Sequence, residues 1–122
     1  MPLYTILTQA GSLGDRKKTE IAGKLADLHS EYAGVPRNWI HVVFQDYAPG
    51  SGFTAGKPAS TVALTLVIRT GRSDEYKQGL LLRLWDLMQQ STGAPDDQLV
   101  VGIQELPASQ AMEMGKPMPS VA

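Results

Sequence analysis

The chain has 122 residues, a formal net charge of −1 at pH 7 and no run of basic residues, so one domain without a nucleic-acid partner is expected. Because there is no cysteine, disulfides, thiolate catalysis and cysteine-bound zinc are excluded. The two histidines, His29 and His41, are too few and too far apart in the sequence to predict a metal site.

The chain begins MPLYTILTQ, and residues 3–9 form a short apolar run that predicts a buried strand. Pro2 stands directly before this run and allows two interpretations. A proline is tolerated at the first position of a strand because it cannot donate a ladder hydrogen bond. Alternatively, removal of the initiator methionine leaves Pro2 as a free secondary amine, which can act as an acid, a base or a nucleophile.

Apolar residues recur at helical spacing from about residue 14 to residue 33 and predict the first helix. The helix is expected to stop at the Gly-x-Pro sequence of residues 34–36, where a left-handed glycine precedes a residue that cannot continue a helix. His29 lies four residues after Leu25 and therefore projects from the core-facing side. It is either a core histidine with satisfied hydrogen bonds or a site residue.

Arg69 and Arg72 lie between a predicted strand at 61–69 and a predicted helix at about 74–91, with Ser73 as a good N-cap for that helix. Two guanidinium groups beside a helix N-terminus provide a seat for a carboxylate or a phosphate. The alternative is a pair of surface arginines neutralised by the acidic residues 74–75. Glu113 follows in a short Pro- and Met-rich tail, where local sequence predicts only a solvated side chain.

An internal repeat fixes the fold class. Residues 25–46 and 84–105 align without a gap at an offset of 59, with seven identical positions, which implies one supersecondary unit used twice. The second strand of each unit is expected at about 39–46 and 98–105. We therefore predict one α/β (α+β) domain over residues 1–122, a β-α-β-β-α-β chain whose four-stranded sheet carries two helices on one face. Its pseudo-repeats span about 2–47 and 61–105, with a joint at 48–60 and a short C-terminal tail at 106–122.

Four sequence features taken together resemble the tautomerase superfamily, and more closely cis-3-chloroacrylic acid dehalogenase and its homologues. They are MPxY at the start, DLH in the first helix, RTGR at residues 69–72, and ELPASQAMEMG at residues 105–115. The resemblance covers nearly the whole chain. It implies the β-α-β-β-α-β fold and a catalytic amino-terminal proline.

The resemblance also implies roles for six residues. As catalytic residues it implies Pro2 as the reacting amine, His29 as a group that positions the carboxylate or polarises the adjoining carbon, and Glu113 as the activator of water. As substrate-binding residues it implies Arg69 and Arg72 for the carboxylate and Trp39 for a pocket wall, although Trp39 is equally compatible with an interior core position.

One position departs from the dehalogenases, because the tyrosine that assists the glutamate in activating water falls on Gly102. Hydration needs a positioned water as well as an acid, whereas tautomerisation needs one proton-moving group and cations that hold the substrate acid. We therefore predict a tautomerase (isomerase) for small 2-oxo, enol or unsaturated acids such as phenylenolpyruvate. Weak hydratase or dehalogenase (hydrolase) activity is expected as a side activity.

The resemblance further implies a homotrimer with a small carboxylate as substrate. No metal, cofactor or membrane partner is expected, and a cytoplasmic location is expected because neither a leader nor a membrane-spanning segment is found in the sequence. Two alternatives stay open: cis-3-haloacrylate dehalogenation or hydration as the main activity, and a non-enzymatic trimeric binding or signalling protein.

Overall fold

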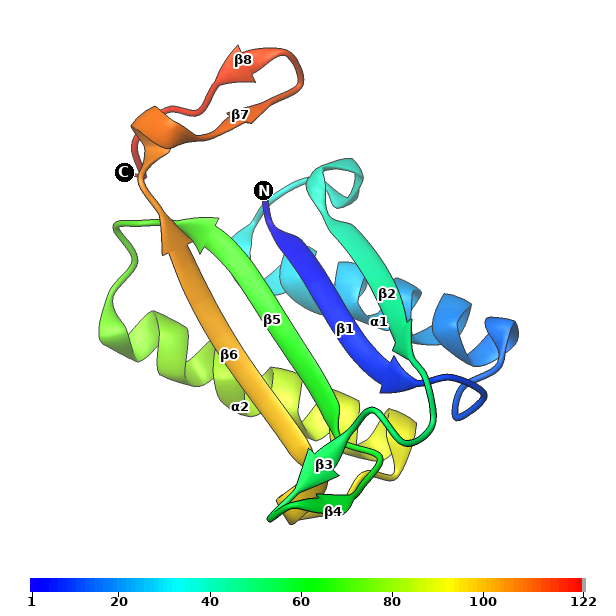
Figure 1. Cartoon of the computed structure of the whole chain (residues 1–122). Helices are drawn as coiled ribbons and strands as arrows, with labels where there is room; N and C mark the ends of the chain where they lie inside the picture. The colour runs from blue at the N-terminus through cyan, green and yellow to red at the C-terminus, as the bar shows by residue number, and fades with distance from the viewer. Residues whose placement is uncertain (122) are drawn as a thin grey trace.

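The computed structural model describes residues 1–121 and confirms the predicted fold class, with four principal strands in one sheet and two helices packed on one of its faces (Figure 1). The principal elements are β1 (Leu3–Gln9), α1 (Asp15–Ala33), β2 (His41–Tyr47), β5 (Val62–Arg69), α2 (Asp74–Thr92) and β6 (Leu99–Leu106). The strand order is β2-β1-β5-β6, with β1 parallel to β2, β5 parallel to β6, and β1 antiparallel to β5. Each parallel pair is connected through a helix, as a parallel pair requires.

One sheet face is covered and the other is open. On β5, alternate residues are buried against the helices, from Val62 to Ile68, while the residues between them face the other way. The core also contains fully buried apolar side chains of both helices and of β1, including Ile21, Leu84 and Ile6. Burial of each large aliphatic side chain contributes roughly 1.5–3 kcal/mol to stability.

The two helices end in the same way and begin differently. α1 and α2 are followed by Gly34 and Gly93 at φ of 70° and 72°, the left-handed conformation that ends a helix. The Ser73 hydroxyl accepts a hydrogen bond from the Tyr76 backbone N–H at 3.1 Å, which confirms the predicted N-cap of α2. α1 follows Gly14 and has no side-chain cap. Among residues 1–121 no helix is long and apolar enough to cross a membrane.

The repeat extends further in the structure than in the sequence alignment. Within the joint, β3 (Phe53–Thr54) and β4 (Lys57–Pro58) form a hairpin, and 59 residues later β7 (Met112–Glu113) and β8 (Lys116–Pro117) form another. Both turns hold two successive residues at positive φ, the geometry of a tight hairpin turn. The two hairpins extend from opposite ends of the sheet (Figure 1), and β7–β8 lies at the end where the N-terminus lies.

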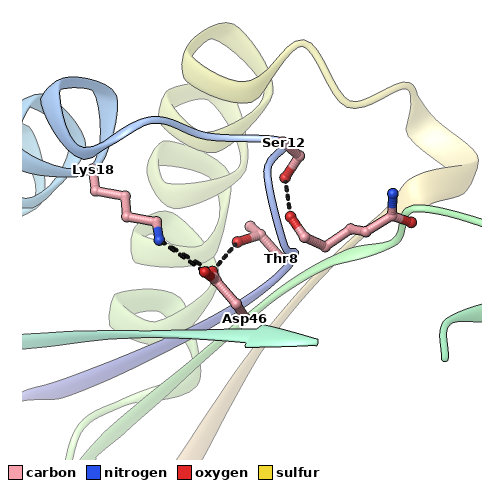
Figure 2. Close-up of polar contacts among 5 residues, drawn as sticks. Thr8, Ser12, Lys18 and Asp46 are labelled. Carbon is pink, nitrogen blue, oxygen red and sulfur yellow. Dashed lines mark hydrogen bonds and ion pairs between the residues drawn. The ribbon is translucent and has the colours of Figure 1, made fainter. Parts of the chain in front are cut away.

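Polar contacts follow the same repeat. Lys18 Nζ on α1 donates to the Asp46 carboxylate on β2 at 3.1 Å, and 59 positions later Lys77 Nζ donates to Glu105 at 2.9 Å. Figure 2 shows the first pair together with Thr8, whose hydroxyl donates to the same carboxylate. Exposed pairs of this kind contribute about 0–1 kcal/mol each. Each pair connects a helix to the strand that follows it.

Candidate active site

A cavity lies at the end of the sheet where the N-terminus, the end of β5 and the beginning of α2 meet. Its lining includes Met1, His29, Arg69, Arg72, Tyr76 and Val121. The cavity measures about 20 Å³, which leaves room for about one water molecule. The fold therefore brings His29 and both arginines, which are far apart in sequence, to the start of the chain.

The N-terminus is held firmly at this cavity. Pro2 is fully buried, and its carbonyl accepts a hydrogen bond from the backbone N–H of His41 at 3.1 Å. The side chain of Met1 is 13% exposed, and the Met1 amine forms an ion pair with Glu113. Burial and the guanidinium of Arg69 lower the pKa of this amine from 8.0 to about 6, while the Glu113 carboxylate opposes the shift by favouring the charged form.

Glu113 is not a solvated tail residue, because the β7–β8 hairpin turns it back onto the N-terminus. Its side chain is 10% exposed, and its Oε1 lies 3.6 Å from Nε2 of His41 on β2. A carboxylate, an imidazole and the terminal amine are thus neighbours. These three neighbouring ionisable groups can exchange a proton with one another.

His29 is held by a residue whose role the sequence did not indicate. The hydroxyl of Tyr4, a fully buried residue on β1, lies 2.5 Å from His29 Nδ1, and the two rings meet edge to face at 83°. Burial raises the pKa of Tyr4 far above its ordinary value, so the phenol keeps its proton. Among the hydrogen bonds of residues 1–121, the Tyr4 hydroxyl has no acceptor other than His29 Nδ1. We therefore assign the donation to the Tyr4 O–H and the imidazole hydrogen to Nε2.

The imidazole of His29 is uncharged at neutral pH. Burial and the nearby Arg72 guanidinium lower the pKa of His29 from 6.5 to about 4. With Nδ1 occupied by Tyr4, the Nε2–H of His29 is the group available to donate a hydrogen bond to a molecule in the cavity. His29 therefore combines both interpretations of the sequence: it is a buried histidine with a satisfied nitrogen, and it lines the cavity.

The two arginines provide the positive charge of the cavity. Arg69 Nη1 donates to the Pro119 carbonyl at 2.6 Å, and the Arg72 guanidinium lies over the Tyr76 ring at 4.9 Å. Within residues 1–121, neither guanidinium takes part in an ion pair, and the ion pair that Asp74 forms is with Lys77. A guanidinium whose only partner is a carbonyl or a ring retains its capacity to bind a carboxylate.

Two positions singled out by the sequence do not line this cavity. Trp39 is half-buried at the end of the short helix η1 (Arg37–Trp39), outside both the cavity lining and the buried core cluster. Gly102 lies in the middle of β6, paired with Thr65 on the open face of the sheet, and a Cβ placed there would meet no atom within 4 Å. The predicted role of Trp39 as a pocket wall stays a prediction.

Tyr4, Tyr76 and the C-terminal segment at Val121 were missed as site residues. For Tyr4 the internal repeat carried a signal, because its counterpart 59 positions later is Ala63 and the counterpart of His29 is Met88. A tyrosine and a histidine that are both absent from the second half can form a pair specific to the first. No comparable signal indicates Val121.

The arrangement has a definite chemical capacity. Two guanidinium groups can hold a carboxylate, a neutral imidazole can donate a hydrogen bond to an oxygen, and an amine beside a carboxylate can move a proton. Among residues 1–121 no three potential metal-ligating side chains come together. Proton transfer on a bound acid is the reaction class that these groups can carry out unaided.

Comparisons with known proteins show the family and the fold of the chain. A family model described as "Putative oxalocrotonate tautomerase enzyme" matches residues 1–122. Native Ps01740, a crystal structure, is 34% identical, with 91% of this chain and 99% of that chain covered at a TM-score of 0.87. The crystal structure of N1, a member of the cis-3-chloroacrylic acid dehalogenase family, is 28% identical. The match covers 97% of this chain and 84% of that chain at a TM-score of 0.90.

More distant structures share the fold alone. A fused 4-OT described as a wild type symmetric trimer is 21% identical, with 95% of this chain and 94% of that chain covered at a TM-score of 0.85. No curated protein matches the chain.

Proposed function

The chain belongs to the family described as "Putative oxalocrotonate tautomerase enzyme", and from that premise we propose that it is an amino-terminal-proline tautomerase. Its substrates are small 2-oxo, enol or unsaturated carboxylic acids. The observation that carries the proposal is the meeting of the chain's N-terminus with His29, Arg69 and Arg72 around one cavity.

Removal of Met1 is the step that prepares the site. With Met1 present, the nitrogen of Pro2 is part of a peptide bond and the cavity holds about 20 Å³. Loss of Met1 converts this nitrogen to a secondary amine and frees the space that the Met1 side chain fills. The substrate then takes that space, with its carboxylate on Arg69 and Arg72.

The proposed reaction moves one proton. The Pro2 amine removes the proton from the enol oxygen, the electron pair forms the carbonyl, and the ammonium returns a proton to the neighbouring carbon. The Nε2–H of His29 donates a hydrogen bond to a substrate oxygen and fixes its position. The guanidinium groups stabilise the negative charge of the enolate while it lasts.

Pro2 must be neutral to act as a base. The amine is expected to experience the same burial and the same Arg69 guanidinium that lower the pKa of the Met1 amine, and both favour the neutral form. The Glu113 carboxylate favours the charged form. We assign Pro2 the role of general base, because burial and the Arg69 guanidinium, the two causes that lower the pKa of the Met1 amine, both favour the neutral form.

The test combines intact mass with a phenylenolpyruvate assay. The processed wild-type protein should turn the enol over, and Pro2→Ala, which keeps a free terminus but changes the secondary amine to a primary one, should lose most of this activity. Protein made while methionine aminopeptidase is inhibited should be inactive. Equal activity in all three preparations would remove Pro2 from the mechanism, and no turnover in any of them would favour a non-enzymatic binding or signalling role.

Hydration or dehalogenation of cis-3-haloacrylates is a second candidate, favoured by the position of Glu113. Its carboxylate is buried beside the N-terminus, where it can activate a water molecule, and its neighbour His41 lies 3.6 Å away. Gly102 stands where the dehalogenases have the tyrosine that assists the glutamate, and it supplies no hydroxyl. This activity should therefore be the weaker one. Glu113→Gln should abolish halide release from cis-3-chloroacrylate while lowering tautomerisation much less. Equal losses of both activities would contradict a role of Glu113 that is specific to water activation.

A homotrimer is proposed as the working assembly. The open sheet face exposes Leu3, Leu7, Val43 and Val100, and Phe53 is exposed on the β3–β4 hairpin. An apolar face of this kind is typical of a subunit interface. Sedimentation should give three times the subunit mass, and a monomer would contradict the proposal.

A further inference from the structure

A second cavity lies at the end of the sheet opposite the candidate active site. It measures about 170 Å³, and its lining includes Ser12, Leu13, Ser60, Thr92 and Gln98. Five of its nine lining residues stand 59 positions from five of the nine that line the first cavity. It is therefore the counterpart of the active-site cavity under the internal repeat.

The polar geometry around this counterpart is preserved with uncharged groups. Thr61 occupies the position of Pro2, Thr54 that of Glu113 and Gln98 that of Trp39. Thr61 Oγ1 donates to Gln98 Oε1 at 3.0 Å, Gln98 Nε2 donates to Thr54 Oγ1 at 3.2 Å, and the two threonine hydroxyls lie 3.3 Å apart. The amine and carboxylate of the first site are thus replaced by a hydrogen-bonded hydroxyl pair.

The second cavity is also the roomier of the two. Met1, which lines the first cavity, has the smaller Ser60 as its counterpart, and the volume rises from about 20 Å³ to about 170 Å³. An apolar cavity of about 150 Å³ holds a molecule of benzene. A ligand of five or six non-hydrogen atoms therefore fits without any movement of the chain.

The lining decides which ligand is favoured. The counterparts of Arg69 and Arg72 are Ala10 and Leu13, and no charged side chain is among the residues that line the cavity. A carboxylate or an ammonium would lose its hydration there without gaining a counter-charge. Hydroxyl and amide groups, in contrast, can both donate and accept hydrogen bonds with an uncharged partner.

The polar groups retain capacity for such a partner. Ser12 Oγ donates to the Gln9 carbonyl at 2.7 Å (Figure 2), which leaves its oxygen free to accept. Gln98 uses one amide hydrogen on Thr54, and Ser60 adds a hydroxyl at the rim. We propose that this cavity binds a small uncharged molecule with a hydrogen-bonding head and a short aliphatic tail, of the class of short-chain amides and alcohols.

Butyramide and butyrate are matched probes for this proposal, because they have nearly the same shape and differ in charge. In amide NMR spectra of the processed full-length protein, butyramide should produce saturable shifts at Ser12, Gly93 and Gln98. Butyrate should shift the residues around Arg69 and Arg72 instead. No saturable shift at the second cavity, or an equal response there to both probes, would overturn the proposal.

Two substitutions that copy residues of the first cavity into the second sharpen the test. Ser60→Met introduces the methionine that lines the first cavity and should weaken butyramide binding at least about tenfold. Ser109→Met, at an exposed serine outside both cavities, should not change it. Leu13→Arg restores the counterpart of Arg72 and should shift the preference of the second cavity to butyrate. Unchanged butyramide binding in Ser60→Met would place the ligand elsewhere.

The tautomerase assay is independent of these readouts. If the second cavity binds butyramide while phenylenolpyruvate is not turned over, the proposed function fails and this inference stands. If turnover is normal and the second cavity stays empty, the inference fails alone.

Discussion

Tyr4→Phe tests whether the Tyr4 hydroxyl positions His29 for the reaction. The substitution keeps the aromatic ring and its edge-to-face contact, and removes only the oxygen that lies 2.5 Å from His29 Nδ1. His29 is 3% exposed, so water cannot readily replace the lost donor. An unsatisfied buried acceptor costs about 1–3 kcal/mol, which should appear as a lower free energy of unfolding.

The same loss should change the site. Without the Tyr4 hydroxyl the imidazole can rotate, and the tautomer with hydrogen on Nδ1 becomes populated. The substrate oxygen then loses a well-placed donor, and kcat/KM should fall about three- to tenfold, equivalent to about 0.7–1.4 kcal/mol of transition-state stabilisation.

Three measurements and one control distinguish this role from a general loss of stability. They are the urea midpoint at constant m-value, the ¹⁵N shifts of His29 that report the tautomer, and kcat/KM on phenylenolpyruvate. Tyr47→Phe is the matched control, because its hydroxyl donates to the Thr61 carbonyl at 2.6 Å, away from His29. If Tyr4→Phe leaves the tautomer and kcat/KM unchanged, or if Tyr47→Phe lowers kcat/KM equally, the argument for a positioning role is refuted.

Three further outcomes are expected. Arg72→Gln should raise KM for the acid at least about tenfold. Arg83→Gln, which removes a guanidinium over the Tyr32 ring, should leave KM unchanged. Equal KM values in both variants would contradict the binding of the substrate carboxylate by Arg72. The pKa of His29 falls from 6.5 to about 4 on folding, so the unfolded chain binds more protons between these pH values. The free energy of unfolding should therefore decrease as pH drops from 6.5 to 4, by at most about 3 kcal/mol. Urea midpoints should fall across this range with a slope that His29→Gln reduces, and an equal slope in both proteins would contradict the assignment. For Pro2 as a base, kcat/KM should rise with pH along an acid limb centred below the ordinary α-amino value of about 8; a flat profile from pH 5 to 8 would count against it.

The principal elements could be predicted from the sequence because their signals are local. Apolar periodicity located both helices to within one residue at each end, and the Gly-x-Pro sequences and Ser73 marked three of their four ends. The β3–β4 and β7–β8 hairpins could not be predicted in the same way, since strands of two residues carry no periodicity. The identical Gly-Lys-Pro sequences at residues 56–58 and 115–117 were the available signal.

The sequence predicted which residues belong to the candidate site, but it did not predict the contacts between them. The meeting of His29 with Tyr4 joins a helix to a strand 25 residues away, and the burial of Glu113 depends on a hairpin that returns to the N-terminus. Neither follows from spacing along the chain. Both depend on the register of β1 between β2 and β5, which only the assembled sheet determines.

The internal repeat separates what the fold requires from what the site adds. Both halves form the same strand, helix and strand, with helix bounds that match at the offset of 59 and strand bounds that differ by one residue. Yet His29 of the first half corresponds to Met88 in the second, and Arg72 of the second half corresponds to Leu13 in the first. Since Met88 is fully buried, an apolar side chain satisfies the packing at this position of the fold. Burying an imidazole there instead costs desolvation that the bond to Tyr4 only partly offsets. Folding therefore gives no reason for His29, and the chemistry of the cavity is the reason that remains.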